Sequence, residues 1–150
     1  MSKVTLLKEV VRDSLPVADA TVATGWLPGQ AFQYDSTGNY GEIASADGAL
    51  FVGMDDDLEL ASPPTGSLVT VLYGAGTTIL VDHAAEVAAS SSDRCYDTVS
   101  GNPESGAYNQ NLYLNGVGKW TTTATGSVKG KLTEIPSSAN SYTIGVITRF

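Results

Sequence analysis

Apolar and polar residues alternate over short stretches of this chain, and turn residues separate the stretches at intervals of roughly ten residues. The clearest stretches read SLVTVLY, TTILVDH, NLYLN and SYTIGVITRF, and they are rich in Val, Ile, Thr and Tyr. Short β-branched segments with regular turns are typical of sandwiches and barrels. The pattern therefore predicts an all-β fold, either a small β-barrel or a sandwich.

One hairpin pattern occurs twice in the chain. The sequence QAFQYDSTGNY, which begins at Gln30, aligns without gaps with QNLYLNGVGKW, which begins at Gln110. In each copy Asp or Asn opens a turn that a glycine completes, and the aromatic residue after the turn, Tyr40 or Trp120, is expected to pack across the hairpin. The apolar residues before the turn, Tyr34 among them, are expected to face inward. An apolar strand with an embedded glycine follows each copy, LFVGM and YTIGVI, so we expect two similar hairpin-plus-strand halves that close into one barrel.

Two regions do not show the strand-and-turn pattern. The N-terminal stretch LLKEVVRDSL is compatible with a helix, as is HAAEVAASSS around residue 86, but the valines of the first favour extended structure. We expect residues 1–20 to form an extended N-terminal arm and residues 21–150 to form the β-barrel domain. The polar stretch 88–110 is expected to form a long surface loop, and its role stays open.

Charge and composition limit the possible partners. The net charge of −8 argues against a nucleic-acid ligand, because binding phosphates requires clustered Lys and Arg. No lysine or arginine lies between Arg12 and Arg94, where acidic residues are concentrated. This middle region is either a solvated acidic face or a surface that meets the basic ends of a neighbouring copy.

The sequence also bears on the compartment. No apolar run is long enough to cross a membrane, and the N-terminus lacks the apolar core and cleavage site of a signal peptide. We therefore expect the chain to be made and folded in the cytoplasm, without a membrane partner. The single cysteine, Cys95, excludes an internal disulfide and is expected to be a surface or half-buried bystander.

No motif in the sequence identifies an enzyme. A hydrolase that uses Asp82 and His83 would need a serine on a strained elbow, and the chain has no GxSxG motif. The two residues end the stretch TTILVDH, so we expect them to mark the end of a strand. We predict no catalytic residue and no cofactor.

One acidic segment resembles the start of a calcium-binding loop. Asp55, Asp57 and Glu59 stand at alternate positions, as the first ligands of such a loop do. The position that needs glycine is Leu60, however, and the position that needs a bidentate glutamate is Gly66. We expect a charged turn and no metal site, with weak divalent-ion binding left as an alternative.

Aromatic residues are the best candidates for a ligand site. Trp26, Tyr40 and Trp120, together with nearby polar side chains, are suited to a platform for the apolar face of a sugar. The repeat favours structural packing for Tyr40 and Trp120. Trp26 has no counterpart in the repeat and is therefore the aromatic residue most available for binding.

The segments NLYLNGVGKWTTTATGS and YTIGVITRF resemble the small head-decoration, or cement, proteins of tailed bacteriophages. The segment PGQAFQYDSTGNYGEIASADGALFVGM shows the same pattern of hairpin and glycine-containing strand. The resemblance covers roughly residues 24–150, and its motifs are short.

The resemblance implies a β-barrel on the outer surface of a virion, commonly a homotrimer at three-fold axes. Such a protein binds the major capsid protein, bridges neighbouring subunits and stabilises the shell against internal DNA pressure. N-terminal arms in these proteins reach a neighbour or the shell, and here the contacting residues would be Lys3, Lys8, Arg12 and Trp26. A carbohydrate- or receptor-binding module of a phage fibre or adhesin is the alternative function, with Trp26, Tyr40 and Trp120 as its platform.

Overall fold

The structure is a computed structural model, and it describes residues 3–8, 10–17, 27–54, 65–83 and 91–150. The described chain consists of β-strands and short 3-10 turns, which confirms the predicted all-β class. The strands are β1 (Lys3–Lys8), β2 (Val11–Val17), β3 (Ala31–Tyr34), β4 (Gly41–Ile43), β5 (Phe51–Gly53), β6 (Ser67–Tyr73), β7 (Thr78–Asp82), β8 (Asn111–Leu114), β9 (Trp120–Thr121), β10 (Gly130–Glu134) and β11 (Ile144–Thr148). The 3-10 turns are η3 (Ser91–Asp93), η4 (Pro103–Ser105) and η5 (Ser138–Asn140).

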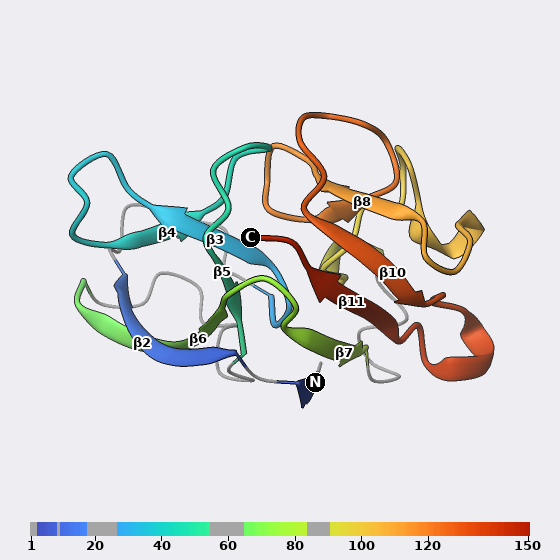
Figure 1. The fold of residues 1–150 in the computed structure, drawn as a ribbon, viewed down its shortest axis with the longest axis horizontal. Helices are drawn as coiled ribbons and strands as arrows, with labels where there is room; N and C mark the ends of the chain where they lie inside the picture. The colour runs from blue at the N-terminus through green and yellow to red at the C-terminus, as the bar shows by residue number, and fades with distance from the viewer. Residues whose placement is uncertain (1–2, 9, 18–26, 55–64, 84–90) are drawn as a thin grey trace.

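The strands form two sheets that lie side by side (Figure 1). The first sheet is a closed barrel with the order β2-β4-β3-β5-β6, in which β4 meets β2 through the parallel pair Gly41 and Val17. The second is a six-stranded sheet with the order β1-β7-β11-β10-β8-β9. All other pairs of strands in the two sheets are antiparallel.

The two sheets repeat one topology. Read from β2, the barrel has the order β2-β6-β5-β3-β4, and the second sheet has the order β7-β11-β10-β8-β9 after its edge strand β1. When the five strands of each half are numbered along the sequence, their order in the sheet is therefore first, fifth, fourth, second and third. The second sheet is not closed in this way, but Trp120 at the start of β9 forms an isolated parallel bridge with Tyr96. The two similar halves predicted from the hairpin repeat are present, but each builds its own sheet instead of sharing one barrel.

The two hairpins match in their hydrogen bonds. The Asp35 side chain accepts backbone N–H groups of the first turn, and the Asn115 side chain does the same in the second. Gly38 and Gly118 take positive φ values of 72° and 68°, as the predicted turns require. The strand beside each hairpin also corresponds, because Gly53 N–H donates to the Gln30 carbonyl as Leu132 N–H donates to the Gln110 carbonyl. The structural counterpart of LFVGM is thus β10, and YTIGVI forms the next strand, β11.

The core has two parts. The inside of the barrel holds a small cluster made of Leu15, Val17, Phe32, Phe51, Val69 and Val71. A larger cluster fills the second half and continues to the outer face of the barrel, where Ala31, Val52 and Leu72 are fully buried. The barrel thus buries side chains on both faces of β5 and β6, which is why SLVTVLY is apolar on both sides.

The N-terminal segment is extended, as predicted, but it does not project from the domain. Residues of β1 pair with β7 in the second sheet, and β2 pairs with β6 along its whole length in the barrel. The inward positions Leu15 and Val17 are buried, so the alternation in VRDSLPV is that of a barrel strand. The expected boundary near residue 20 is therefore not where the β domain begins.

The polar stretch 88–110 is not only a surface loop. Over its described part, from residue 91, it carries two 3-10 turns and places Arg94, Cys95 and Tyr96 in the interior. The Cys95 carbonyl accepts the Trp120 N–H, and the Trp120 carbonyl accepts the Asp97 N–H. These residues complete the second half, and this role explains why a long irregular segment has a buried centre.

Candidate functional site

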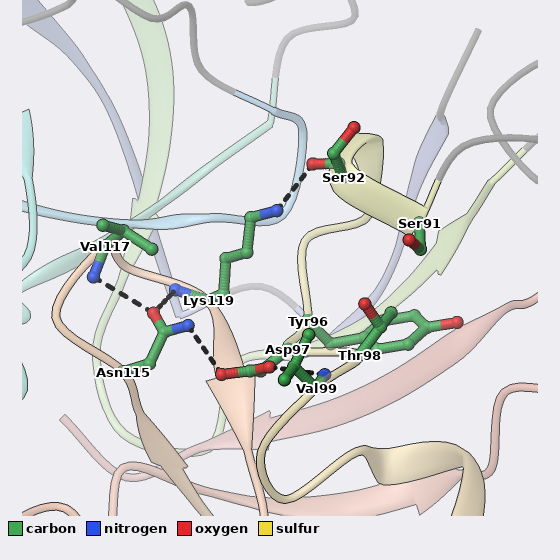
Figure 2. Close-up of a pocket in the computed structure, with 9 residues that line it drawn as sticks. All are labelled: Ser91, Ser92, Tyr96, Asp97, Thr98, Val99, Asn115, Val117 and Lys119. Atoms are coloured by element: carbon green, nitrogen blue, oxygen red, sulfur yellow. Dashed lines mark hydrogen bonds between the residues drawn. The ribbon is translucent and has the colours of Figure 1, made fainter.

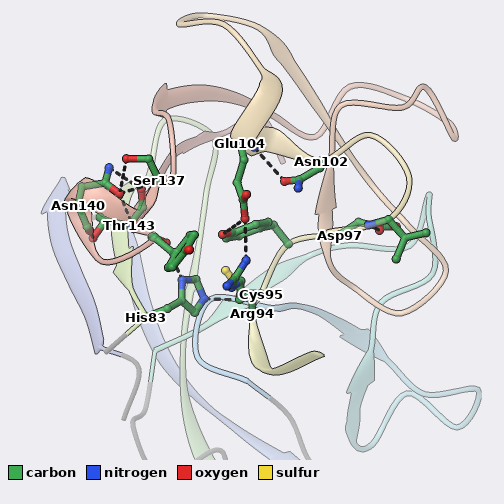
Figure 3. Close-up of polar contacts among 12 residues, drawn as sticks. His83, Arg94, Cys95, Asp97, Asn102, Glu104, Ser137, Asn140 and Thr143 are labelled. Carbon is green, nitrogen blue, oxygen red and sulfur yellow. Dashed lines mark hydrogen bonds and ion pairs between the residues drawn. The ribbon is translucent and has the colours of Figure 1, made fainter. Parts of the chain in front are cut away.

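Buried polar side chains gather where residues 91–105 pack on the second sheet (Figure 3). Arg94 Nη1 lies 2.7 Å from Glu104 Oε1, and the same oxygen accepts the Tyr96 hydroxyl at 2.9 Å. The Arg94 guanidinium also lies 3.9 Å from the ring centroid of Tyr142, a cation–π contact. Burial, followed by the bond to Glu104, raises the pKa of Tyr96. These groups bond to one another, so the cluster serves to anchor the segment.

His83 belongs to the same region and has a structural role. Its ring is buried, with Nδ1 2.8 Å from the Tyr142 carbonyl and Nε2 3.1 Å from the Cys95 N–H. A carbonyl can only accept and an N–H can only donate, so the ring is neutral with its proton on Nδ1. Burial lowers the pKa of His83 and keeps this form. Neither the buried ring nor the exposed Asp82 at the end of β7 forms a Ser-His-Asp arrangement.

Cys95 differs from the prediction. Its side chain is fully buried rather than at or near the surface. Burial raises the pKa of the Cys95 thiol to about 12, so the group stays protonated at neutral pH. A protonated thiol is neither a good nucleophile nor a metal ligand.

A pocket of about 280 Å³ lies beside the second hairpin (Figure 2). Its polar groups are used by the protein itself: Asn115 Nδ2 donates to Asp97 Oδ2 at 3.1 Å, and Lys119 Nζ donates to the Ser92 carbonyl at 2.6 Å. Burial opposes ionisation of Asp97, but the N–H groups of Ser100 and Val99 and the Asn115 amide outweigh it and lower its pKa. The polar groups of this pocket therefore stabilise the turn of the second hairpin.

The mouth of the barrel forms a second, more apolar pocket of about 380 Å³. The Phe51 ring lies edge-to-face against Tyr34, with 5.2 Å between ring centroids, and against Tyr73, with 5.6 Å. The remaining lining residues are Asp13, Leu50, Gly74 and Phe150. Barrel mouths are frequent ligand sites, and this mouth combines aromatic walls with one carboxylate.

Sequence reasoning did not find this pocket. The expectation that Tyr34 belongs to the core is wrong, because its side chain is 45% exposed although it lies on the inward side of β3. Asp13, Phe51 and Tyr73 were not among the binding residues predicted from the sequence. The repeat contained a usable signal, because it places Tyr34, a ring with a polar hydroxyl, at the position of Leu114, a purely apolar side chain that is fully buried.

The predicted contact residues that the structure describes lie on the consecutive strands β1 and β2. Lys3 begins β1, opposite Asp82, and Lys8 ends it, with an exposed side chain. Arg12 is exposed on β2. Trp26 lies outside the described residues. Lys8 and Arg12 are thus close in sequence on the segment that joins the two sheets, and Trp26 cannot be placed beside them.

The proposed sugar platform is not assembled in the described part of the chain. Trp120 is fully buried, its indole N–H donates to the Gly29 carbonyl at 2.9 Å, and its ring stacks on Phe150. Tyr40 is half-buried at the end of the first turn. The packing role that the repeat favoured for Trp120 is therefore the observed one, and its ring offers no face to a ligand.

The acidic segment with Asp55, Asp57 and Glu59 also lies outside the described residues. Among the residues that the structure does describe, no group of three or more His, Cys, Asp or Glu side chains is arranged to hold a metal ion. The same residues contain no helix with the length and apolar character needed to span a membrane.

Exposed apolar side chains mark the segment between the two sheets. Leu7 is 58% exposed, Val10 is 45% exposed and Val11 is 36% exposed. Lys8 follows Leu7 and Arg12 follows Val11 in the sequence, and we call these five residues the N-terminal strip. Val11 pairs with Tyr73, so the strip adjoins the mouth of the barrel. Contiguous exposed apolar groups are typical of protein interaction sites.

No protein-family model matches the chain, and no curated protein matches it significantly.

Proposed function

We propose that this chain is a viral capsid decoration protein, which binds the outer surface of an assembled phage head and stabilises it by bridging capsid subunits. The proposal assigns it no catalytic role. The major capsid protein would be its partner, and a homotrimer its working form on the virion. One observation carries the proposal: the N-terminal strip exposes the apolar side chains of Leu7, Val10 and Val11 next to the exposed basic residues Lys8 and Arg12.

The composition of the strip supports a protein partner. Apolar side chains favour a contact that removes them from water, and the contribution is about 25 cal/mol for each Å² of apolar surface buried. Lys8 and Arg12 would add steering toward an acidic surface, which affects the rate of association more than its strength. The acidic residues are concentrated in residues 13–93, which contain no lysine or arginine, so copies repel one another through this region.

The repeated hairpins also support the proposal. The resemblance to decoration proteins depends on a hairpin of the form Gly-Gln, apolar-x-apolar, Asp or Asn, x-x-Gly, which the second copy matches from Gln110 onward. Both copies of this pattern fold as matching hairpins, at Gln30 and at Gln110. A rigid duplicated β module is suited to bridging, because it presents fixed surfaces on both halves.

The stabilising mechanism would be mass action. A protein that binds the assembled lattice but not free subunits shifts the equilibrium toward the lattice by RT ln(1 + [L]/Kd). At a ligand concentration of about 100 times Kd this amounts to about 2.7 kcal/mol for each site. Several contacts for each trimer would add avidity.

The test uses heads of the phage that encodes this gene, prepared without the protein. Purified protein should co-sediment with these heads and raise their melting temperature. The double variant Lys8→Glu/Arg12→Glu should bind less, whereas Lys131→Glu/Arg149→Glu, which changes two basic residues of the second half, should bind as the wild type does. Heads that melt at the same temperature with and without saturating protein would refute the stabilising role, and the sedimentation mass of the free protein would test the trimer.

The carbohydrate- or receptor-binding alternative has less support in the described residues. Its platform required Trp120, and this ring is fully buried. A glycan array with the wild-type protein separates the two functions, because specific glycan binding without binding to heads would favour the alternative.

A further inference from the structure

The mouth of the barrel differs in kind from the matching region of the second half. Equivalent positions in the two halves follow from the strand pairing. Asp13 of the first half is equivalent to Ile79 of the second, Tyr34 to Leu114, and Tyr73 to Thr148. The three second-half side chains are buried, with at most 2% exposure. The first half thus has larger or more polar side chains where the second half has a closed core.

A second difference lies inside the barrel. Gly41, the first residue of β4, corresponds to Trp120, the first residue of β9, because Tyr34 pairs with Gly41 and Leu114 pairs with Trp120. The indole of Trp120 fills the second half and stacks on Phe150. At the equivalent position the barrel has a glycine, and the Leu15 side chain packs against the Gly41 backbone instead.

The aromatic residues form walls rather than a flat platform. The Phe51 ring stands at 87° to Tyr34 and at 85° to Tyr73, with centroid distances of 5.2 and 5.6 Å. A sugar requires a flat ring face and several hydrogen-bonding groups around it. Rings at right angles to one another instead suit a compact group that contacts more than one ring.

Asp13 gives the pocket its charge. It stands two residues before Leu15 on the inward side of β2, opposite Val71, and it lines the pocket. Its Oδ1 accepts the Ser14 N–H at 2.7 Å, and among the described residues its Oδ2 has no hydrogen-bond partner. No lysine or arginine is among the residues that line this pocket in the described chain. The pocket therefore combines aromatic rings with an available negative charge.

We propose that the mouth of the barrel is a binding site for an organic cation, held by the rings of Tyr34, Phe51 and Tyr73 and by the carboxylate of Asp13. A cation is attracted to the face of an aromatic ring, and a carboxylate adds direct charge pairing. The cation is either an alkylammonium compound or a Lys or Arg side chain of a partner. The site is independent of the capsid proposal, because it lies on the barrel itself and needs no shell.

The test is an NMR titration of the full chain with labelled aromatic side chains. The probes are tetramethylammonium chloride, acetyl-lysine methylamide and acetyl-arginine methylamide, with tert-butanol as a neutral probe and methyl β-glucoside as a sugar. We expect shifts of the Tyr34, Phe51 and Tyr73 ring signals with the cations, and weaker binding at higher salt. Preference for the amino-acid probes would identify a protein side chain as the source, and preference for tetramethylammonium would identify a free ligand.

Variants with matched controls make the test specific. Asp13→Asn and Tyr34→Leu should each weaken cation binding about five-fold or more, from the lost charge pairing and the lost cation–π contact. Leucine is compatible with the fold at residue 34, since the second half has Leu114 at the matching position. Asp82→Asn and Tyr108→Leu change an exposed carboxylate and an exposed ring elsewhere, and should leave binding unchanged. Equal binding of tert-butanol, preference for the glucoside, or no ring shifts at all would overturn the proposal.

Discussion

The stability of this protein should depend on pH through one buried side chain, His83. It is the only histidine in the sequence, so no other imidazole contributes. Its Nδ1–H donates to the Tyr142 carbonyl and its Nε2 accepts the Cys95 N–H. Adding a proton to Nε2 would place two donors face to face in the core. Burial first, and then the positive charge of Arg94, lower the pKa of His83, while the bond to Tyr142 and the charge of Asp82 oppose the shift only in part.

The direction and size of the effect follow from linkage. A histidine in the unfolded chain has a pKa of about 6.5, whereas folded His83 stays neutral to lower pH. The unfolded state therefore binds more protons below about pH 6.5, and the folded state loses stability as the pH falls. The loss is at most about 1.4 kcal/mol at pH 5.5, the limit for an imidazole that stays fully neutral when folded, and it grows as the pH falls toward the folded pKa. The loss ends at the folded pKa, and full stability is present above about pH 7.

The assay is urea unfolding followed by circular dichroism at pH 7.5, 6.5 and 5.5. This range lies above the ordinary pKa values of Asp and Glu, about 3.9 and 4.3. Asp35, whose pKa is lowered first by its bond to Thr37, contributes only at still lower pH. The control is His83→Gln, which should be less stable at pH 7.5 but should not change between pH 7.5 and 5.5. An unchanged free energy of unfolding in the wild type, or an equal decline in the variant, would refute the reasoning.

Two further predictions concern the turns and the thiol. Gly118→Ala should lower the free energy of unfolding in urea by about 1–3 kcal/mol more than Gly38→Ala does. Both glycines have positive φ, but only at Gly118 would an added Cβ lie 2.6 Å from the Ala31 carbonyl oxygen. Equal losses in the two variants would contradict this reasoning. Cys95 should react with a thiol reagent such as DTNB only as fast as the protein opens, because its side chain is fully buried and burial also raises its pKa to about 12. Rapid reaction of the folded protein would show that the thiol is accessible.

The sequence was informative wherever a structure depends on neighbouring residues. Asp35 and Asn115 open their turns by accepting backbone N–H groups, and the glycines that follow take positive φ, so both hairpins could be predicted. The same local reasoning recognised the end of a strand at Asp82. These features need no information about which strands pair over long distances.

The errors arose where distant segments decide the outcome. The N-terminal residues are extended in either case, and only the pairing of β1 with β7 and of β2 with β6 makes them part of the sheets. Likewise, the Arg94 side chain is buried because it meets Glu104 and Tyr142, and neither contact follows from the polar composition of the segment. Alternation predicted the side of β3 on which Tyr34 lies, but not that this end of the barrel is open.

The two halves show how one topology can serve two purposes. In the second half, Tyr96 and Trp120 form a parallel bridge and are fully buried, and the Trp120 indole also bonds to the Gly29 carbonyl of the first half. This half gains stability from its filled interior, and the first half packs its outer face against it. Because the barrel is supported from outside in this way, its mouth can keep Asp13 and exposed aromatic rings in place of a closed core. A site for binding is therefore expected in the first half rather than in the second, and filling the mouth should remove binding without unfolding the chain.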